Sequence, residues 1–177
     1  FMRSQGLYSG MLAVVLFALL IGGAHPGCAM VTGQTANEGK GPAILLVTFG
    51  TSVEGAKAAF RNIEKRFKAA FPQTEVRWAY TSKTIRKKLA RENVQVDSPE
   101  MAMVRLMEAG YTKVAVQSLH MIPGAEFHEI NTNTRLFAQM VGGIEQVRVA
   151  LPLLVSDATM DKALQIVMTE VVPKERN

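Results

Sequence analysis

The sequence has a single cysteine, Cys28, and three histidines among 177 residues. One cysteine excludes a disulfide framework within the chain and a multi-cysteine zinc site, and three histidines leave little for an all-histidine metal site. Aromatic residues make up only 7%, yet hydrophobic residues reach 48%, which is enough for one domain with a real core. This composition argues against disorder.

The positive charge is concentrated in one stretch of the chain. The stretch from Lys57 to Arg91 contains eleven Lys and Arg residues and only two Glu. The stretch from Glu92 to Asn177 contains seven basic and eleven acidic residues. The cluster within residues 83–91 could hold a polycarboxylate or a polyphosphate, or it could be a solvated helix face. No nucleic-acid-binding fold or exposed interleaved aromatic pattern accompanies it, so no nucleic-acid partner is expected.

The first 29 residues have the pattern of an export signal and are not expected to be part of the fold. The uncharged apolar run Met11–Ile21 has eleven residues, too few to span a bilayer and typical of a signal-peptide core. Small residues follow it, so we expect a signal peptide over 1–29, cleavage after Ala29, a flexible leader over 30–41 and a periplasmic protein. A lipoprotein anchored through Cys28 is the alternative, although the preceding His-Pro-Gly is a poor context for lipidation.

From residue 42 onward, apolar strands alternate with amphipathic helices. The strands are expected at 43–49, 75–80, 113–119 and 146–151, and the helices at 54–71, 82–91, 98–110, 125–141 and 156–172. This order predicts an α/β fold: a doubly wound, four-stranded parallel sheet with strand order 2-1-3-4.

Ligands of such sheets bind beyond the carboxyl ends of the strands, where the strand order reverses, here between the first and third strands. Thr51 and Ser52, after the first strand, could offer hydroxyls and backbone amides to an anion. They match neither a P-loop nor a dinucleotide fingerprint, so no nucleotide is expected. His120, after the third strand, is a candidate proton acceptor or ligand, and equally a histidine hydrogen-bonded to a neighbouring loop.

The helix expected over 125–141 carries two more candidates near its start. At about 100° per residue, Glu126 and His128 lie about 200° apart, on opposite flanks of the apolar stripe, so one centre cannot readily use both. Glu126 lies nearer the crevice and could accept a proton or contact a metal, or simply be stabilised by the helix dipole. His128 points toward solvent or a partner subunit. The stripe itself is expected to be Phe127, Ile130, Thr134, Phe137 and Val141.

Four stretches resemble the N-terminal half of the anaerobic cobalt chelatases, the sirohydrochlorin cobaltochelatases. The stretches FGTS and QSLHxIPGxEF are the most specific of them. The four are ILLVTFGTS (44–52), WAYTSKTIRKKL (78–89), DSPEMAMVRLMEAGYTKVAVQSLHMIPGAEFHEI (97–130) and VALPLLVSD (149–157).

The resemblance implies ATP-independent insertion of Co(II), or Fe(II), into sirohydrochlorin by two similar α/β domains that face each other across a cleft. Residues 42–177 correspond to the first domain. Glu126 is implied as an acidic residue of the active site and a possible metal contact, with His120 as a supporting base. Metal-binding histidines are implied for a Gly-His-Gly loop in the second domain, which this sequence lacks, so we expect the chain alone to be inactive. Candidate contacts to the carboxylates of sirohydrochlorin are Thr51, Ser52, Arg86 and Lys87.

Exported members of the family resemble this chain at one further position. There the histidine of GxEFH binds haem b between subunits, and His128 occupies that position. The resemblance therefore implies an axial haem ligand in a homodimer or tetramer. The rival interpretation is a periplasmic haem- or tetrapyrrole-binding or transport protein without chelatase activity, and a third is a flavodoxin-like binding module.

Overall fold

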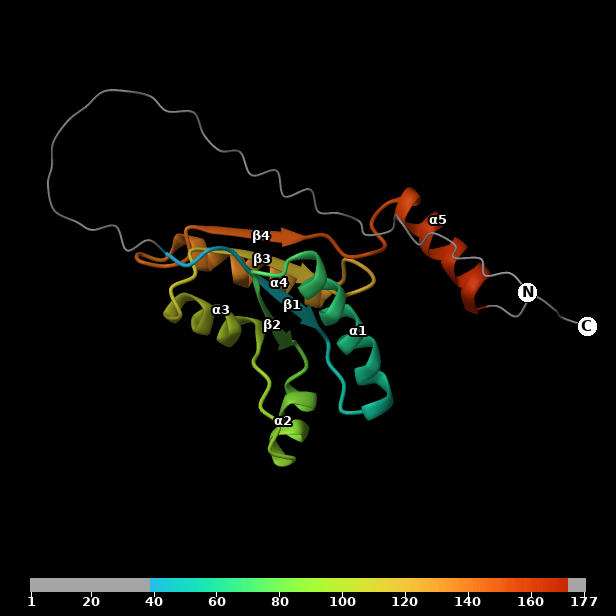
Figure 1. Cartoon of the computed structure of the whole chain (residues 1–177), viewed down its shortest axis with the longest axis horizontal. Coiled ribbons are helices and arrows are strands. Elements are labelled where there is room, and N and C mark those ends of the chain that lie inside the picture. Colours follow the sequence, from blue (N-terminus) through green and yellow to red (C-terminus); the bar gives the residue numbers. More distant parts are fainter. Residues whose placement is uncertain (1–38, 172–177) are drawn as a thin grey trace, which may run out of the picture. The chain divides into compact units, whose positions relative to one another are not determined.

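The computed structural model describes residues 39–171, so the expected signal peptide and most of the leader lie outside the described residues. The expected alternation of strands and helices is confirmed (Figure 1). The strands are β1 (Ala43–Thr48), β2 (Glu75–Tyr80), β3 (Lys113–Ser118) and β4 (Gln146–Ala150). The helices are α1 (Glu54–Ala70), α2 (Lys83–Arg91), α3 (Pro99–Glu108), α4 (Ala125–Leu136) and α5 (Asp157–Ile166).

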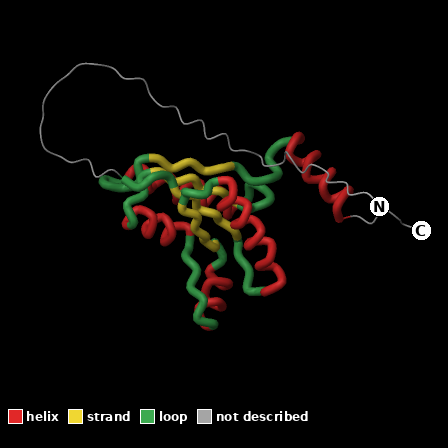
Figure 2. Tube along the Cα trace, viewed as in Figure 1, coloured by secondary structure: helices red, strands yellow, loops and turns green. Residues whose placement is uncertain are grey.

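The four strands form one parallel sheet in the order β2-β1-β3-β4, as the sequence predicts. The four strands lie side by side in Figure 2, and the arrows of Figure 1 run in the same direction, so their carboxyl ends lie along one edge of the sheet. β1 is buried along its whole length because it is central and covered on both faces.

One face of the sheet packs against α3 and α4 around a continuous apolar core. β1 contributes Leu45 and Val47, α3 contributes Met103 and Leu106, and α4 contributes Ile130. α3 begins where the sequence indicates it should: the Ser98 hydroxyl accepts a hydrogen bond from the Met101 amide at 3.3 Å, and proline follows in the first turn.

The opposite face of the sheet meets α1 through aromatic contacts. The Phe60 ring lies 5.3 Å from the Trp78 ring and 5.9 Å from the Tyr80 ring, centroid to centroid. The two strand residues pair in register with Leu46 and Thr48 of β1, which share this face. No residue of α1 is fully buried, so this helix covers the sheet with a half-buried stripe. Helices therefore lie on both faces, as a doubly wound fold requires.

The prediction of a helix to residue 141 is wrong in its last turn. α4 ends at Leu136 and tightens into the 3-10 turn η1 (Phe137–Gln139), after which Met140 is extended with ψ 136°. The first four residues of the expected stripe are buried, but Val141 is fully exposed. The cause is a sharp turn, since Gly142 adopts φ +70° and a Cβ atom on Gly143 would lie 2.6 Å from the Phe137 carbonyl oxygen.

α5 differs from the other helices in its burial. It begins with a capping box formed by Ser156 and Thr159, and it continues as a π-helical segment, η2 (Val167–Val171). None of its residues is buried, and Met160 and Leu164 are among its exposed apolar side chains. Among the described residues, no helix is both long and apolar enough to cross a bilayer.

Candidate functional site

Backbone hydrogen bonds tie the loops at the carboxyl edge of the sheet together. After β2, the Thr81 amide donates to the Thr48 carbonyl at 2.9 Å. After β4, the Leu153 amide donates to the His120 carbonyl at 3.3 Å and the Leu154 amide to the Met121 carbonyl at 2.7 Å. Loops that are far apart in the sequence therefore form one continuous surface at this edge.

Large apolar side chains are exposed on three neighbouring loops of this surface. Because the strand order is 2-1-3-4, the loops after β1, β3 and β4 follow one another along the edge. Isolated exposed apolar residues need no explanation, but a group of them at a ligand-binding edge does. We call this group the apolar rim, and it consists of Phe49, Val53, Met121, Ile122, Leu151, Leu153 and Val155.

His120 follows β3, where the sequence predicts it, and its side chain is half-buried. Its Nδ1 atom lies 3.0 Å from the Ser118 hydroxyl, while its Nε2 atom is buried without a hydrogen-bond partner in the described part of the chain. Burial lowers the pKa of the imidazole below its ordinary 6.5, and the negative charge of Glu126 opposes this shift only in part. The ring is therefore mostly neutral near pH 7, and its Nε2 atom is enclosed by the surrounding residues of the described chain.

Glu126 and Arg86 both line one small cavity. It has a volume of about 100 Å³ and lies where α2, α3 and α4 meet the loop after β2. Glu126 is exposed at the first turn of α4, and Arg86 is half-buried on α2. Two buried polar atoms that have no hydrogen-bond partner within residues 39–171 belong to residues lining this cavity: the Arg86 Nε and the Thr81 Oγ1. The complete lining is Thr81, Arg86, Ser98, Pro99, Glu100, Glu126, Glu129 and Ile130.

Glu100 supplies a fixed negative charge beside this cavity. Burial would raise the pKa of its carboxyl, but hydrogen bonds from Asn133, from its own backbone amide and from Ser98, together with the charge of Arg86, lower the pKa below 4.5. The Asn133 amide nitrogen lies 3.0 Å from Glu100 Oε1. Glu100 is therefore ionised and already hydrogen-bonded.

The other candidates from the sequence lie outside this cavity. The Thr51 hydroxyl accepts a hydrogen bond from the Val53 amide at 3.0 Å, so it stabilises its own turn. Ser52 is half-buried in the same loop, and Lys87 is exposed on α2. His128 is exposed on α4, with its ring edge-to-face against Phe127 at 5.7 Å.

Sequence reasoning missed four polar residues that line the cavity: Thr81, Ser98, Glu100 and Glu129. Thr81 could have been found, because it directly follows a strand and therefore lies at the carboxyl edge. The glutamates could not, since their position depends on how α3 and α4 pack against each other. Nowhere in residues 39–171 do three or more His, Cys, Asp or Glu side chains gather as a metal site would require.

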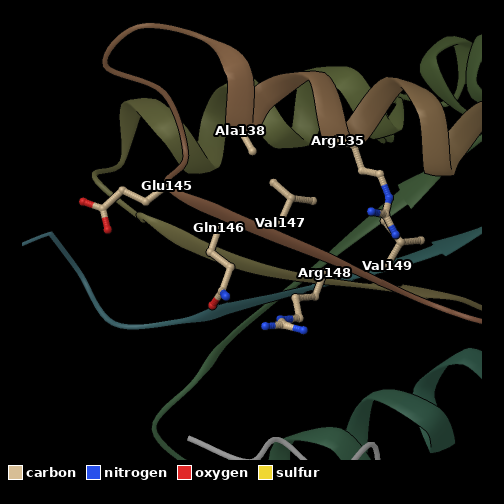
Figure 3. Close-up of a pocket in the computed structure, with 7 residues that line it drawn as sticks. All are labelled: Arg135, Ala138, Glu145, Gln146, Val147, Arg148 and Val149. Carbon is tan, nitrogen blue, oxygen red and sulfur yellow. The ribbon is translucent and has the colours of Figure 1, made fainter. Parts of the chain in front are cut away.

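A wider, open groove of about 370 Å³ runs along the edge strand β4 (Figure 3). Ala138 and Arg135 border it from the helical side, whereas Gln146 and Arg148 point away from that side. The groove follows the length of the strand rather than its carboxyl end. It is therefore separate from the surface on which His120 and Glu126 lie.

Comparisons with known proteins show the family of the chain. The family model described as cobalt chelatase (CbiK) matches residues 42–177. The chain is 34% identical over 120 residues to sirohydrochlorin cobaltochelatase CbiKC of Nitratidesulfovibrio vulgaris, covering 68% of this chain and 42% of that protein. It is also 34% identical over 118 residues to sirohydrochlorin cobaltochelatase of Salmonella typhimurium, covering 64% and 43%. The chain thus spans less than half the length of these curated relatives. It belongs to the CbiK cobalt chelatase family.

Proposed function

We propose that this chain forms one wall of the active site of a sirohydrochlorin cobaltochelatase, which inserts Co(II), or Fe(II), into sirohydrochlorin without ATP. One observation supports this most strongly. At the carboxyl edge of the sheet, an apolar rim lies beside an ionisable pair, Glu126 and His120, in a chain whose relatives are named for this reaction.

The reaction needs three things that this edge can supply in part. A macrocycle must be held through its apolar face, two pyrrole protons must leave, and a metal ion must be delivered. The apolar rim suits the first task. The exposed Glu126 can accept a proton or contact the metal substrate, and His120, whose buried Nε2 has no partner in the described part of the chain, is the candidate supporting base.

The chelatase proposal is tested by cobalt insertion measured from the absorbance change of sirohydrochlorin under anaerobic conditions. We expect the 177-residue chain alone to match the uncatalysed rate, because the resemblance assigns the principal histidine ligands to a second domain. A fusion that supplies the remaining part of the Nitratidesulfovibrio relative should catalyse insertion.

In that fusion, Glu126→Gln should lower the rate by at least about tenfold, as expected for loss of a proton-transfer group. Glu145→Gln, on the distant β4 groove, removes a similar exposed carboxylate and should leave the rate unchanged. Robust turnover by the chain alone, or a fusion unaffected by Glu126→Gln, would contradict this assignment.

A second function, haem binding by His128 in an exported oligomer, is favoured by the position of this side chain. The imidazole is exposed and is not part of the Glu126 cavity, so it is free to act as an axial ligand to haem b. Added haem should produce a Soret band and shift the protein to a dimer or tetramer on gel filtration, and His128→Ala should abolish both. An unchanged spectrum in the variant would exclude this role.

Export of the chain is a separate proposal. If the signal peptide is cleaved as expected, N-terminal sequencing should show that the secreted form begins at Met30.

A further inference from the structure

α5 carries an apolar stripe that the described part of the chain leaves uncovered. Met160, Leu164 and Val167 follow one another at helical spacing, and about half or more of each side chain is exposed. Within that part of the chain, α5 makes no substantial packing contact except with its own continuation η2, and it stands apart from the other helices (Figure 1). Because an amphipathic helix is stabilised mainly by packing of its apolar face, a surface that covers this stripe is expected.

One half of the sheet is open on the side that α1 covers. β3 is a central strand, yet only alternate residues of it are buried, whereas the central β1 is buried along its whole length. The half-buried Ala115 and Gln117 pair in register with Ile44 and Leu46, which places them on the same face as α1. α1 packs mainly against β2, so β3 and β4 lack a helix on this side. We call this surface the open face, and it consists of Lys113, Ala115, Gln117, Gln146, Arg148 and Ala150.

The stripe and the open face are complementary in charge. Asp161 lies beside the stripe, about 100° from Met160, whereas Lys162 lies on the opposite side of the helix, about 200° away. Lys113 and Arg148 are both exposed on the open face. Within residues 39–171 none of these charged side chains forms an ion pair. Docking the stripe on the open face would bring an acidic side chain to a basic surface.

Hydrogen bonds at the base of α5 hold it away from the open face of its own chain. The Leu153 and Leu154 amides are bound to the loop after β3, which leaves only Val155 and Ser156 as a hinge. Both hinge amides donate to the Thr159 hydroxyl, at 3.3 Å and 3.1 Å. Folding α5 back onto its own sheet would break these bonds, whereas a second copy of the chain can receive the helix as it stands.

We propose that two copies of this chain associate by exchanging α5, so that the stripe of each copy packs on the open face of the other. The exchange is two-fold symmetric, and one dimer therefore buries both surfaces twice. The association goes beyond the proposed function and needs no haem. It involves neither Glu126 nor His128, so its failure would leave the chelatase and haem proposals standing.

Self-association is measured by analytical ultracentrifugation of the 177-residue chain without haem. The wild type should form a dimer that dissociates on dilution, and α5 is exposed again in the monomer. Leu164→Glu should raise the dissociation constant by at least about tenfold, because it places a charge in the centre of the stripe. Ile166→Glu is the matched control: Ile166 is also exposed but lies about 200° from Leu164, so the constant should rise less than about twofold.

Cross-linking separates exchange between copies from folding back within one chain. In a Cys28→Ser background, Met160→Cys combined with Arg148→Cys should give a covalent dimer when a short bismaleimide is added. Arg135→Cys replaces Arg148→Cys in the matched control, because Arg135 is an equally charged, exposed residue on the helical side of β4. The control pair should give much less dimer.

Four results would each overturn the exchange. They are a monomer at every concentration, equal effects of Leu164→Glu and Ile166→Glu, equal dimer yields from the two cysteine pairs, and a cross-link that forms within one chain. Circular dichroism checks that each variant is folded, as expected for substitutions at exposed positions.

Discussion

Gly50, in the loop after β1, is a position where a side chain should not be accommodated. It adopts φ +97°, and a Cβ atom there would lie 2.4 Å from the Tyr80 ring. We expect Gly50→Ala to lower the free energy of unfolding by about 2 kcal/mol or more, from backbone strain and the clash together. Urea denaturation measures this change.

Gly55→Ala is the matched control for Gly50→Ala. Gly55 lies in the first turn of α1, and a Cβ atom there would meet nothing within 4 Å. Alanine should therefore raise the stability by about 0.5 kcal/mol through its better helix propensity. Equal losses of stability at the two glycines would show that the contact with Tyr80 is not what constrains Gly50.

His120 should make the folding stability depend on pH. Its pKa in the folded chain lies below 6.5, chiefly because it is buried, so the unfolded chain binds the proton more readily. The neutral, buried ring is therefore the form compatible with full stability. Its contribution is complete above the pKa of the unfolded chain, declines as the pH falls below that value, and is lost once the pH passes below the pKa of the folded chain. The free energy of unfolding should therefore fall less between pH 7.5 and pH 5.5 in His120→Gln than in the wild type. An identical pH dependence in both proteins would mean that His120 is not desolvated.

At the scale of elements, helix caps should matter only where the helix is packed. Ser98 caps α3, which buries Met103 and Leu106 in the core, so Ser98→Ala should lower the free energy of unfolding by about 1 kcal/mol. Ser156 caps α5, which has no buried residue, so Ser156→Ala should change global stability by less than about 0.5 kcal/mol. Chemical denaturation compares the two variants, and a larger loss for Ser156→Ala would show that α5 is packed in solution.

The sequence predicts elements best where periodicity and end signals agree. β1 is recognisable as an unbroken apolar run, and α3 as a Ser-Pro start followed by a glycine end. α4 is harder, because its apolar spacing continues to Val141 although the helix has already tightened at Phe137. Two successive glycines end that helix by a tight backbone turn, a tertiary detail that spacing does not reveal.

At the scale of the whole molecule, topology leads from the sequence to one edge of the sheet but not to the side chains that gather there. The order of strands and helices predicts the sheet order, the switch-point rule then selects the loop that holds His120, and the start of the following helix adds Glu126. The rule does not show which neighbours share a cavity with them. Thr81 and Glu100 lie on different elements from Glu126, and only the packing of α2, α3 and α4 brings their side chains together.

The central claim, that a tetrapyrrole binds at the carboxyl edge of this sheet, is tested most directly by NMR. Sirohydrochlorin is titrated into the ¹⁵N-labelled chain, and the perturbed amide signals are mapped onto the structure. We predict that they cluster on the loops after β1, β3 and β4, around Phe49, Met121 and Leu153, and at the start of α4. Perturbations confined to the groove along β4, or none at all, would contradict the claim.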